Sequence, residues 1–227
     1  MTNTVIANIQ NLSISFGQQV VLSDLSLKLY KNKVHLLSGP SGSGKTTFLR
    51  ALNRLNDCFP LCKTEGQIEL FINGRCQQIN QIKIQDLPAL RQSVGMVFQH
   101  PQLLPGSIQD NVLLPLKVLT NLTGDVARDK LKEVAVQVGL WDEIKHRLHK
   151  PATSLSGGQQ QRLCLARTLA LEPEILLLDE PTSSLDKIAA SKIEECISQL
   201  AKEYTIVMVS HSAEQAEKLA DYIIHIK

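Results

Sequence analysis

The sequence predicts an α/β fold with a parallel sheet at its centre. Short apolar runs within KVHLLSGP, VGMVFQ and EILLLDEP are typical of strands that are buried on both faces. In the second half of the chain, strands alternate with helical patterns, which favours parallel pairing through crossover helices. With 227 residues and 43% hydrophobic content, the chain is long enough for one large domain with a substantial core.

The first third of the chain is predicted to form strands. Residues 5–17 and 20–30 alternate apolar and polar side chains around Gly17, which is typical of an antiparallel pair with one face in water. The stretch EGQIELFING indicates another hairpin strand. A helix is predicted after Gly44, with a face made of Phe48, Leu49, Leu52 and Leu55.

The region that follows VGMVFQ is interpreted as an inserted helical lobe. A helix is predicted at Val126–Val138, with Gly139 as its stop. Three prolines of this region are placed in loops, namely Pro101, Pro105 and Pro115. After the lobe we expect helices at Lys187–Lys202 and Ala213–Ala220, each followed by a strand.

We therefore expect a single domain, 1–227, with two parts. Segments 1–99 and 163–227 form the core together with the antiparallel β subdomain, and residues 100–162 form the inserted helical subdomain.

Composition argues against several classes of protein. The net charge is +2, the basic residues are scattered and only 4% of residues are aromatic, which disfavours nucleic-acid binding. Five cysteines show no disulfide pattern, and Cys58 and Cys62 lack further partners for a metal site. The N-terminal stretch has no secretory signal, so we expect a cytoplasmic protein. No apolar run approaches the roughly 18 residues of a membrane span, so any crossing must come from another subunit.

The segment GPSGSGKTT matches the phosphate-loop pattern G-x-x-x-x-G-K-[ST], and it lies between a predicted buried strand and a helix. Glycines let successive backbone N–H groups face phosphates, Lys45 reaches the β- and γ-oxygens, and the Thr46 hydroxyl is a Mg²⁺ ligand. The alternative is a Gly/Ser-rich turn, which this context disfavours. The predicted nucleotide-binding residues here are Gly39, Pro40, Ser41, Gly42, Ser43, Gly44, Lys45, Thr46 and Thr47.

Polar residues follow the other predicted strands. Asp179 comes at the end of ILLL, beside the phosphate loop, where it can support Mg²⁺, and Glu180 would face the γ-phosphate and polarise a water. Alone, this pair could merely cap the next helix. Gln99 and His211 end two further strands and point at the same crevice of a parallel sheet.

A second anion-binding helix start is predicted in LSGGQQQRLCLAR. Gly157 and Gly158 leave backbone N–H groups unshielded beside the Ser156 hydroxyl. The alternative is a plain serine cap. Each glycine costs a helix about 1 kcal/mol relative to Ala. A cap alone does not need them, so the pattern favours close approach by a phosphate.

The phosphate loop, Gln99, LSGGQ, ILLLDE, SSLD and His211, in this order, resemble the ATP-binding subunit of ATP-binding-cassette (ABC) transporters over nearly the whole chain. This resemblance implies a P-loop NTPase (RecA-like) core. The pattern of the ATPase of bacterial phosphate importers is similar in LNRLND, EGQIELFING, LWDEIKHRL and KEYTIVMVSH. The segment HPQLLPGSIQDNV after Gln99 departs from that subfamily, and this segment faces the membrane partner in the family.

The resemblance also implies roles for individual residues. One monomer would hold ATP and Mg²⁺ on its phosphate loop, while the signature residues of a second monomer close over the γ-phosphate; these are Ser156, Gly157, Gly158 and Gln159. Phe16 would stack on adenine, although a strand hydrophobe is the alternative. Gln99 would sense Mg²⁺ and the transmembrane subunit. The remaining roles are a general base for Glu180, a dimer contact for Asp186 and a γ-phosphate switch for His211.

By the same resemblance, the chain hydrolyses ATP to energise an importer of phosphate or another small solute. The implied partners are polytopic transmembrane permease subunits, a second, identical ATPase subunit and an extracytoplasmic substrate-binding protein, at the cytoplasmic face of the cell membrane. No nucleic-acid partner is expected. The alternatives are a soluble ABC-type ATPase that acts on nucleic acid or the ribosome, and a phosphate-loop kinase or GTPase. The latter would leave LSGGQ and His211 without a role.

Overall fold

The chain forms two sheets that meet side by side, as the computed structural model shows for residues 4–227. Residues 1–3, which the predicted domain includes, lie outside the described part. One sheet is antiparallel with the strand order β2-β1-β4-β5, and the other is parallel with the order β6-β7-β8-β3-β9. The predicted α/β architecture is confirmed: a parallel sheet forms the core, and an antiparallel sheet is built from the N-terminal part of the chain.

The antiparallel sheet contains the strands predicted in the first third of the chain. Its strands are β1 (Val5–Phe16), β2 (Gln19–Tyr30), β4 (Cys62–Ile72) and β5 (Arg75–Gln78). β1 lies between β2 and β4 and pairs with both in antiparallel register. Asn73 and Gly74 join β4 to β5 with φ angles of 52° and 70°, as a tight hairpin turn requires.

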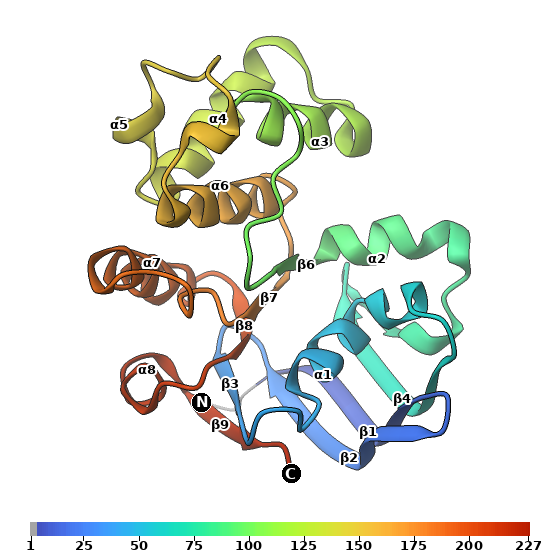
Figure 1. The fold of residues 1–227 in the computed structure, drawn as a ribbon. Coiled ribbons are helices and arrows are strands. Elements are labelled where there is room, and N and C mark those ends of the chain that lie inside the picture. The colour runs from blue at the N-terminus through green and yellow to red at the C-terminus, as the bar shows by residue number, and fades with distance from the viewer. Residues whose placement is uncertain (1–3) are drawn as a thin grey trace.

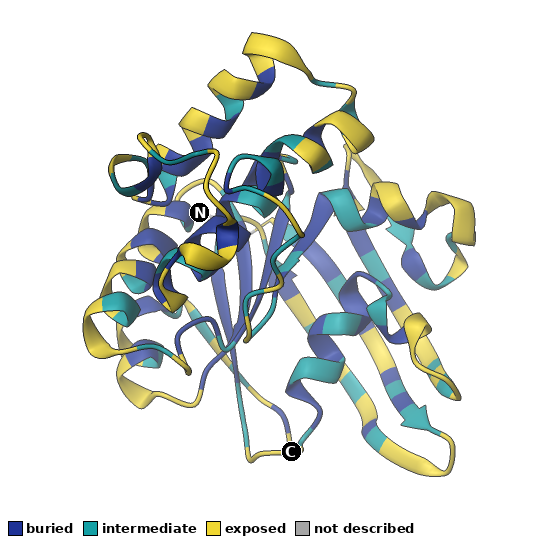
Figure 2. Ribbon diagram, turned by 45° about the horizontal axis from the view of Figure 1, so that its top comes forward, coloured by how far each residue is buried: buried dark blue, intermediate teal, exposed yellow. Residues whose placement is uncertain are grey.

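The parallel sheet is the buried centre of the molecule. Its strands are β3 (Val34–Ser38), β6 (Val94–Val97), β7 (Ile175–Asp179), β8 (Thr205–Val209) and β9 (Tyr222–His225). Every residue of β7 and β8 is buried. In Figure 2 the central strands are almost continuously dark blue, whereas the antiparallel strands alternate between buried and exposed residues. The two patterns are those of a sheet covered on both faces and of a sheet with one face in water.

Side chains of the parallel strands pack into two apolar cores on opposite faces of the sheet. Leu176 and Leu178 of β7 pack into the core that contains the helical lobe, whereas Ile175 and Leu177 pack into the core beneath the antiparallel sheet. This alternation is the period of two that a strand imposes. The helical lobe and the antiparallel sheet are therefore both packed against the parallel sheet, one on each of its faces.

Helices cover both faces of the parallel sheet and build the separate lobe (Figure 1). They are α1 (Lys45–Leu52), α2 (Leu87–Ser93), α3 (Asp110–Thr120), α4 (Gly124–Gln137), α5 (Trp141–Ile144), α6 (Gly157–Leu169), α7 (Lys187–Leu200) and α8 (Ala213–Leu219). Short 3-10 turns occupy Leu55–Cys58, Ile79–Gln81, Ile84–Asp86 and Ala152–Ser154. Within residues 4–227, none of the helices combines the length and apolar character that a membrane span requires.

Two expectations about helices need correction. Leu55 does not belong to α1, because the helix ends at Leu52 and Leu55 begins a 3-10 turn. Pro115 lies inside α3 rather than in a loop. Its ring removes one backbone hydrogen bond, but the neighbouring Val112 and Leu116 are buried in the helical core, and this burial outweighs the local propensity.

α6 and α7 pack closely where Gly158 meets Ala189. A Cβ atom added to Gly158 would lie 2.8 Å from the Cβ of Ala189, closer than such atoms approach in proteins. At Gly157 the nearest atom, in Leu185, would lie 3.5 Å away, an ordinary contact. Close packing of α6 against α7 therefore also requires a glycine at position 158. The sequence interpretation weighed only a phosphate contact against a plain serine cap and did not consider this packing.

This packing predicts a specific coupling between Gly158 and Ala189. In a double-mutant cycle of urea unfolding, Gly158→Ala should be more favourable by about 1–3 kcal/mol in an Ala189→Gly background than in the parent chain, because overpacking is relieved. Gly157→Ala is the matched control and should show no such coupling. Additive effects of Gly158→Ala and Ala189→Gly would contradict the close contact.

His35 of β3 is a fully buried histidine with aromatic neighbours. Its ring stacks on Tyr30 and Tyr222, with centroid distances of 6.1 and 5.1 Å. The backbone N–H of Tyr30 donates to His35 Nε2 over 2.9 Å. Burial lowers the pKa of His35, and the Tyr30 backbone oxygen, 3.2 Å from Nε2, offsets this only in part. The neutral ring is therefore the form that fits this core.

The lowered pKa of His35 predicts acid sensitivity of the fold. The unfolded chain takes up this proton near pH 6.5 while the folded chain does not, so stability from His35 is complete above that pH and declines as the pH falls. The free energy of unfolding should thus decrease less between pH 7.5 and 5.5 in His35→Phe than in the parent. Equal decreases, measured by urea denaturation, would rule out this contribution.

Candidate nucleotide-binding and catalytic site

The phosphate loop joins the end of β3 to the start of α1. Gly42 and Gly44 take φ angles of 81° and 90°, in the left-handed region. A side chain on Gly44 would also collide with Leu22, because its Cβ would lie 2.8 Å from Leu22 Cδ2. The loop is thus compact, and the free backbone N–H groups at the start of α1 form an anion-binding end.

Lys45 folds back across this loop. Its side-chain ammonium donates to the backbone oxygens of Gly39 and Pro40 over 3.0 and 2.7 Å, and the residue is only 5% exposed. The hydroxyl of Ser43 is buried without a hydrogen-bond partner among the described residues. A buried cation and an unsatisfied hydroxyl within one glycine-rich loop fit an oxygen-rich anion such as a phosphate chain.

Thr46 and Asp179 connect the loop to the central strand. The Thr46 hydroxyl donates to Asp179 Oδ1 over 2.7 Å. Burial raises the pKa of the Asp179 carboxyl, which is 5% exposed, and the Thr46 hydroxyl offsets this only in part. A nearby divalent cation would stabilise the buried carboxylate. Mg²⁺ prefers oxygen ligands such as hydroxyl and carboxylate groups, so Thr46 and Asp179 fit a magnesium site.

Glu180 and His211 meet beside the phosphate loop. Glu180 Oε1 lies 3.1 Å from His211 Nε2, a contact that is an ion pair only while the imidazole is protonated. Glu180 also has a left-handed φ of 46°, held in part by its N–H, which donates to Val209 O over 3.2 Å. Such local strain in a non-glycine residue is a feature of functional sites.

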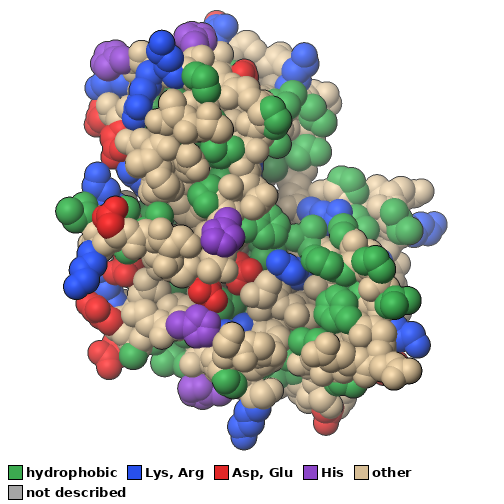
Figure 3. Space-filling view, viewed as in Figure 1, with side chains coloured by type: hydrophobic (Ala, Val, Ile, Leu, Met, Phe, Trp, Pro, Cys, Tyr) green, Lys and Arg blue, Asp and Glu red, His purple; other side chains and the backbone are tan. Residues whose placement is uncertain are grey.

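A cavity of about 210 Å³ unites these groups. Its walls are formed by Val21, Ser41, Gly42, Gly44, Lys45, Thr46, Thr47, Glu180 and His211. Figure 3 shows histidine and acidic side chains side by side on this face of the molecule. The structure therefore brings an anion cradle together with a carboxylate and an imidazole that could move or hold a proton.

Gln99 lies near this site but not in the cavity wall. β6 ends at Val97, so Gln99 follows the strand by two residues instead of ending it. Its Nε2 donates to Ser183 Oγ over 3.1 Å, and that hydroxyl donates to the backbone oxygen of Glu180 over 3.1 Å. Gln99 is therefore linked to the Glu180 loop through Ser183.

Phe16 lies at the end of β1 and is half-buried. Its ring meets Phe59 edge to face, with 6.1 Å between centroids, and packs against the core beneath the antiparallel sheet. It does not line the 210 Å³ cavity. Stacking on adenine thus stays a prediction for this residue.

The signature residues form helix caps at a separate place. Ser156 Oγ accepts from Gln159 N over 3.4 Å and Ser156 N donates to Gln159 Oε1 over 3.0 Å, a reciprocal capping box. Asp186 caps α7 by accepting from the N–H groups of Ile188 and Ala189, each over 2.9 Å. Among the described residues, neither these caps nor Gly157 and Gly158 line the phosphate-loop cavity.

Two polar anchors were missed by the sequence interpretation. Glu143 accepts from Gln159 Nε2 over 2.6 Å and from Arg162 Nη2 over 2.9 Å, which holds α5 against the signature helix. Burial raises the pKa of Glu143, but these hydrogen bonds outweigh it and leave the pKa below its usual range. No local pattern marks Glu143, because its partners lie 16 and 19 residues away.

Gln215 of α8 is the second anchor. Its Nε2 donates to Thr182 Oγ1 and its Oε1 accepts from Ser210 Oγ, both over 2.6 Å. Thr182 follows Glu180 by two residues and Ser210 precedes His211, so one buried amide fixes both neighbouring segments. Its position four residues after His211, on a predicted helix, was the available signal.

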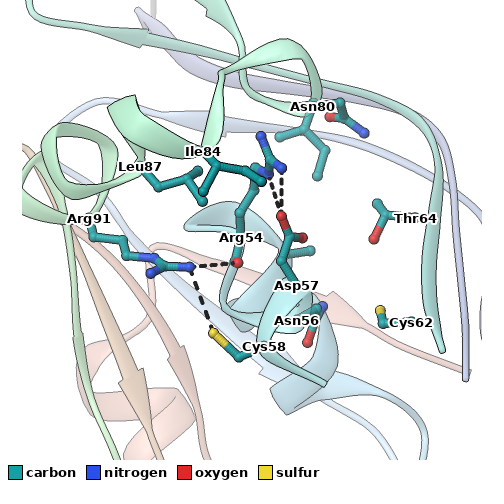
Figure 4. A pocket seen from close by; sticks show the side chains of 12 residues that line it. Arg54, Asn56, Asp57, Cys58, Cys62, Thr64, Asn80, Ile84, Leu87 and Arg91 are labelled. Atoms are coloured by element: carbon teal, nitrogen blue, oxygen red, sulfur yellow. Dashed lines mark hydrogen bonds and ion pairs between the residues drawn. The ribbon is translucent and has the colours of Figure 1, made fainter. Parts of the chain in front are cut away.

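A larger cavity, about 600 Å³, lies elsewhere in the described part of the chain. Figure 4 shows Arg54 pointing toward Asp57, and Arg91 toward Cys58 and the carbonyl of Arg54. Residues of the LNRLND stretch therefore brace the turn after α1 against α2. None of the predicted site residues lines this cavity, so the smaller one at the phosphate loop is the candidate site.

Comparisons with known proteins identify the family of this chain. Residues 22–183 match the family described as ABC transporter. The chain is 45% identical to phosphate import ATP-binding protein PstB 2 of Bacillus licheniformis, over 95% of this chain and 77% of the relative. It is 44% identical to phosphate import ATP-binding protein PstB of Thermotoga maritima, over 96% of this chain and 85% of the relative.

Solved structures show the same fold. CbiO1 of Clostridium perfringens, part of the ABC transporter complex CbiONQ, superposes with a TM-score of 0.83 at 26% identity, over 99% of this chain and 85% of that one. The ATP-binding cassette MJ0796, a dimer bound to ADP and Pi, gives 0.81 at 29% identity, over 98% and 94%. The chain therefore belongs to the ABC transporter family, as one of its ATP-binding, ATP-hydrolysing cassettes.

Proposed function

We propose that this chain is the ATPase subunit of a membrane importer of phosphate. Two copies act at the cytoplasmic face of the membrane, together with permease subunits and an extracytoplasmic substrate-binding protein. The observation that carries the chemistry is the shared cavity in which Glu180 and His211 face the phosphate loop. Phosphate as the solute rests on the two relatives named as phosphate import proteins.

In this proposal the phosphate loop binds the ATP phosphates. The Lys45 ammonium exchanges its bonds to Gly39 and Pro40 for bonds to the β- and γ-oxygens. Thr46 and Asp179 would hold Mg²⁺, with Gln99 nearby, and a bound Mg²⁺ would supply positive charge that neutralises the phosphate oxygens. Phe16 supplies an aromatic surface for the adenine.

Glu180 is the general base. Its carboxylate removes a proton from a water molecule whose oxygen attacks the γ-phosphorus, while the bond from that phosphorus to the β–γ bridging oxygen breaks and ADP leaves. His211, 3.1 Å from Glu180, keeps the carboxylate in position and contacts the γ-phosphate through its imidazole. The left-handed backbone at Glu180 fixes the side chain over the cradle.

The second half of the site comes from a second copy. Ser156, Gly157, Gly158 and Gln159 approach the γ-phosphate held by the partner, and Asp186 lies at the contact between the copies. A dimer with ADP and Pi is known for MJ0796, which has the same fold. The lobe at residues 100–162 moves with the signature helix and transmits closure to the permease. Hydrolysis thereby depends on dimer closure.

Removing the proposed base should separate binding from hydrolysis. Glu180→Gln should lower kcat for ATP hydrolysis by about 10²–10⁴-fold, because the amide cannot take up the proton, while Mg²⁺–ATP affinity stays within about twofold. Phosphate release and equilibrium dialysis measure the two quantities. Glu195→Gln, at an exposed position of α7, is the control and should match the parent. Wild-type hydrolysis by Glu180→Gln in the assembled complex would refute the assignment.

The identity of the solute can be tested on the intact complex. In liposomes that contain the purified complex and its substrate-binding protein, phosphate should stimulate ATP hydrolysis and sulfate at equal concentration should not. A complex with Glu180→Gln should respond to neither. Stimulation by another solute alone would refute phosphate but retain the ATPase, and stimulation by RNA or DNA would favour work on nucleic acid.

A further inference from the structure

Gln161 lies in the middle of the signature helix and reaches a distant segment. It is 2% exposed, and its Nε2 donates to the backbone oxygen of Phe98 over 2.8 Å. Phe98 precedes Gln99 directly. The hydrogen bond therefore joins α6, which begins with the signature residues, to the segment that carries Gln99.

The other end of this contact leads to the proposed general base. Gln99 Nε2 donates to Ser183 Oγ, and Ser183 Oγ donates to the backbone oxygen of Glu180, each over 3.1 Å. Glu180, Ser183, Gln99, Phe98 and Gln161 thus form a continuous path in space. Each link is a hydrogen bond, except for the peptide bond between Phe98 and Gln99. The phosphate loop and the signature residues of one chain, which in the proposed dimer contact two different ATP molecules, are joined through this path.

The amide of Gln161 is poorly explained by stability alone. Its Oε1 is buried and has no hydrogen-bond partner among the described residues. An unsatisfied buried acceptor offsets much of the gain from the bond to Phe98. A methionine of similar length would fill the same space without that cost. What the amide adds beyond volume is the directional bond to the Phe98 carbonyl.

The segment beyond Gln99 is also fastened at its far end. The side chain of Asn111, at the start of α3, is fully buried. It accepts from the N–H of Leu104 over 2.8 Å and donates to the oxygens of Leu104 and Ser107 over 3.1 and 3.0 Å. Residues 98–111 are thus held by side-chain amides at both ends, so a displacement of Gln99 is passed on instead of being absorbed by a loose loop.

We propose that Gln161 is a positioning residue that couples nucleotide occupancy at the phosphate loop to the signature helix of the same chain. The inference rests on the proposed function, because it takes Gln99 as the group that responds to the nucleotide. When the Gln99 segment shifts, the bond from Gln161 to Phe98 draws α6 with it. The signature residues are thereby placed to contact the partner's ATP only when the phosphate loop of the same chain has bound a nucleotide.

The neighbouring residue Gln160 provides a matched control. It lies on the same helix, but its Nε2 donates to Leu155 O over 2.9 Å, a contact within the signature turn itself. Gln160→Met and Gln161→Met are the same substitution on consecutive residues. Only the second removes a bond between α6 and the Gln99 segment.

The test is hydrogen–deuterium exchange on the full chain in a Glu180→Gln background, so that added Mg²⁺–ATP persists. Protein is kept at a concentration at which sedimentation shows monomers, so protection of α6 cannot come from a second copy. Two peptides are followed, one covering the phosphate loop and α1 at 39–52 and one covering α6 at 157–169.

Mg²⁺–ATP should change exchange in both peptides of the background chain and of Gln160→Met. In Gln161→Met the response at 39–52 should stay, whereas the response at 157–169 should fall at least about twofold, as expected from loss of one hydrogen bond. A purely structural role would alter α6 exchange without ATP and leave the ATP-induced difference unchanged.

Equal α6 responses in Gln161→Met and the background chain would overturn the inference, and so would an absent α6 response in the background chain. No response at 39–52 in any chain has a different meaning. It would show that ATP does not bind the phosphate loop, and the proposed function itself would fail.

Discussion

The phosphate loop and the polar residues beside it depend on the parallel pairing of four neighbouring strands. In the order β6-β7-β8-β3, every strand runs in the same direction, so their carboxyl ends share one edge of the sheet. The residues after those ends are Gln99, Glu180, His211 and the phosphate loop. Segments up to about 170 residues apart in sequence are thereby brought to one place by backbone hydrogen bonds. The Thr46–Asp179 bond then fixes α1 to this edge.

What the sequence could predict follows from how local each signal is. The buried strands, the phosphate loop and the α7 helix are marked by consecutive residues, and the structure has them where they were expected. Pro115 was placed wrongly because its helix is stabilised by burial of Val112 and Leu116 in a core that no local pattern reveals. The packing role of Gly158 was likewise not predicted, since Ala189 lies 31 residues further along the chain.

Side chains that hold the site in place are harder to predict than those that form it. Glu143, Gln161 and Gln215 are ordinary helix residues in the sequence, and each acquires its partners only when distant segments pack. Buried amides such as Gln161 and Gln215, and the half-buried carboxylate of Glu143, contribute little net stability, because desolvation offsets most of each hydrogen bond. Their effect is on geometry: they restrict helices and loops to a narrow set of relative positions.

The capping box at Ser156 has a further consequence for dimer closure. Capping uses a lone pair of the hydroxyl, which accepts from the N–H of Gln159, and leaves the hydroxyl proton free. The same oxygen can therefore keep its helix capped while it donates that proton to an anion. Under the proposed function, engaging a partner's γ-phosphate does not unravel the first turn of α6, so the helix remains rigid at the moment when it must transmit force.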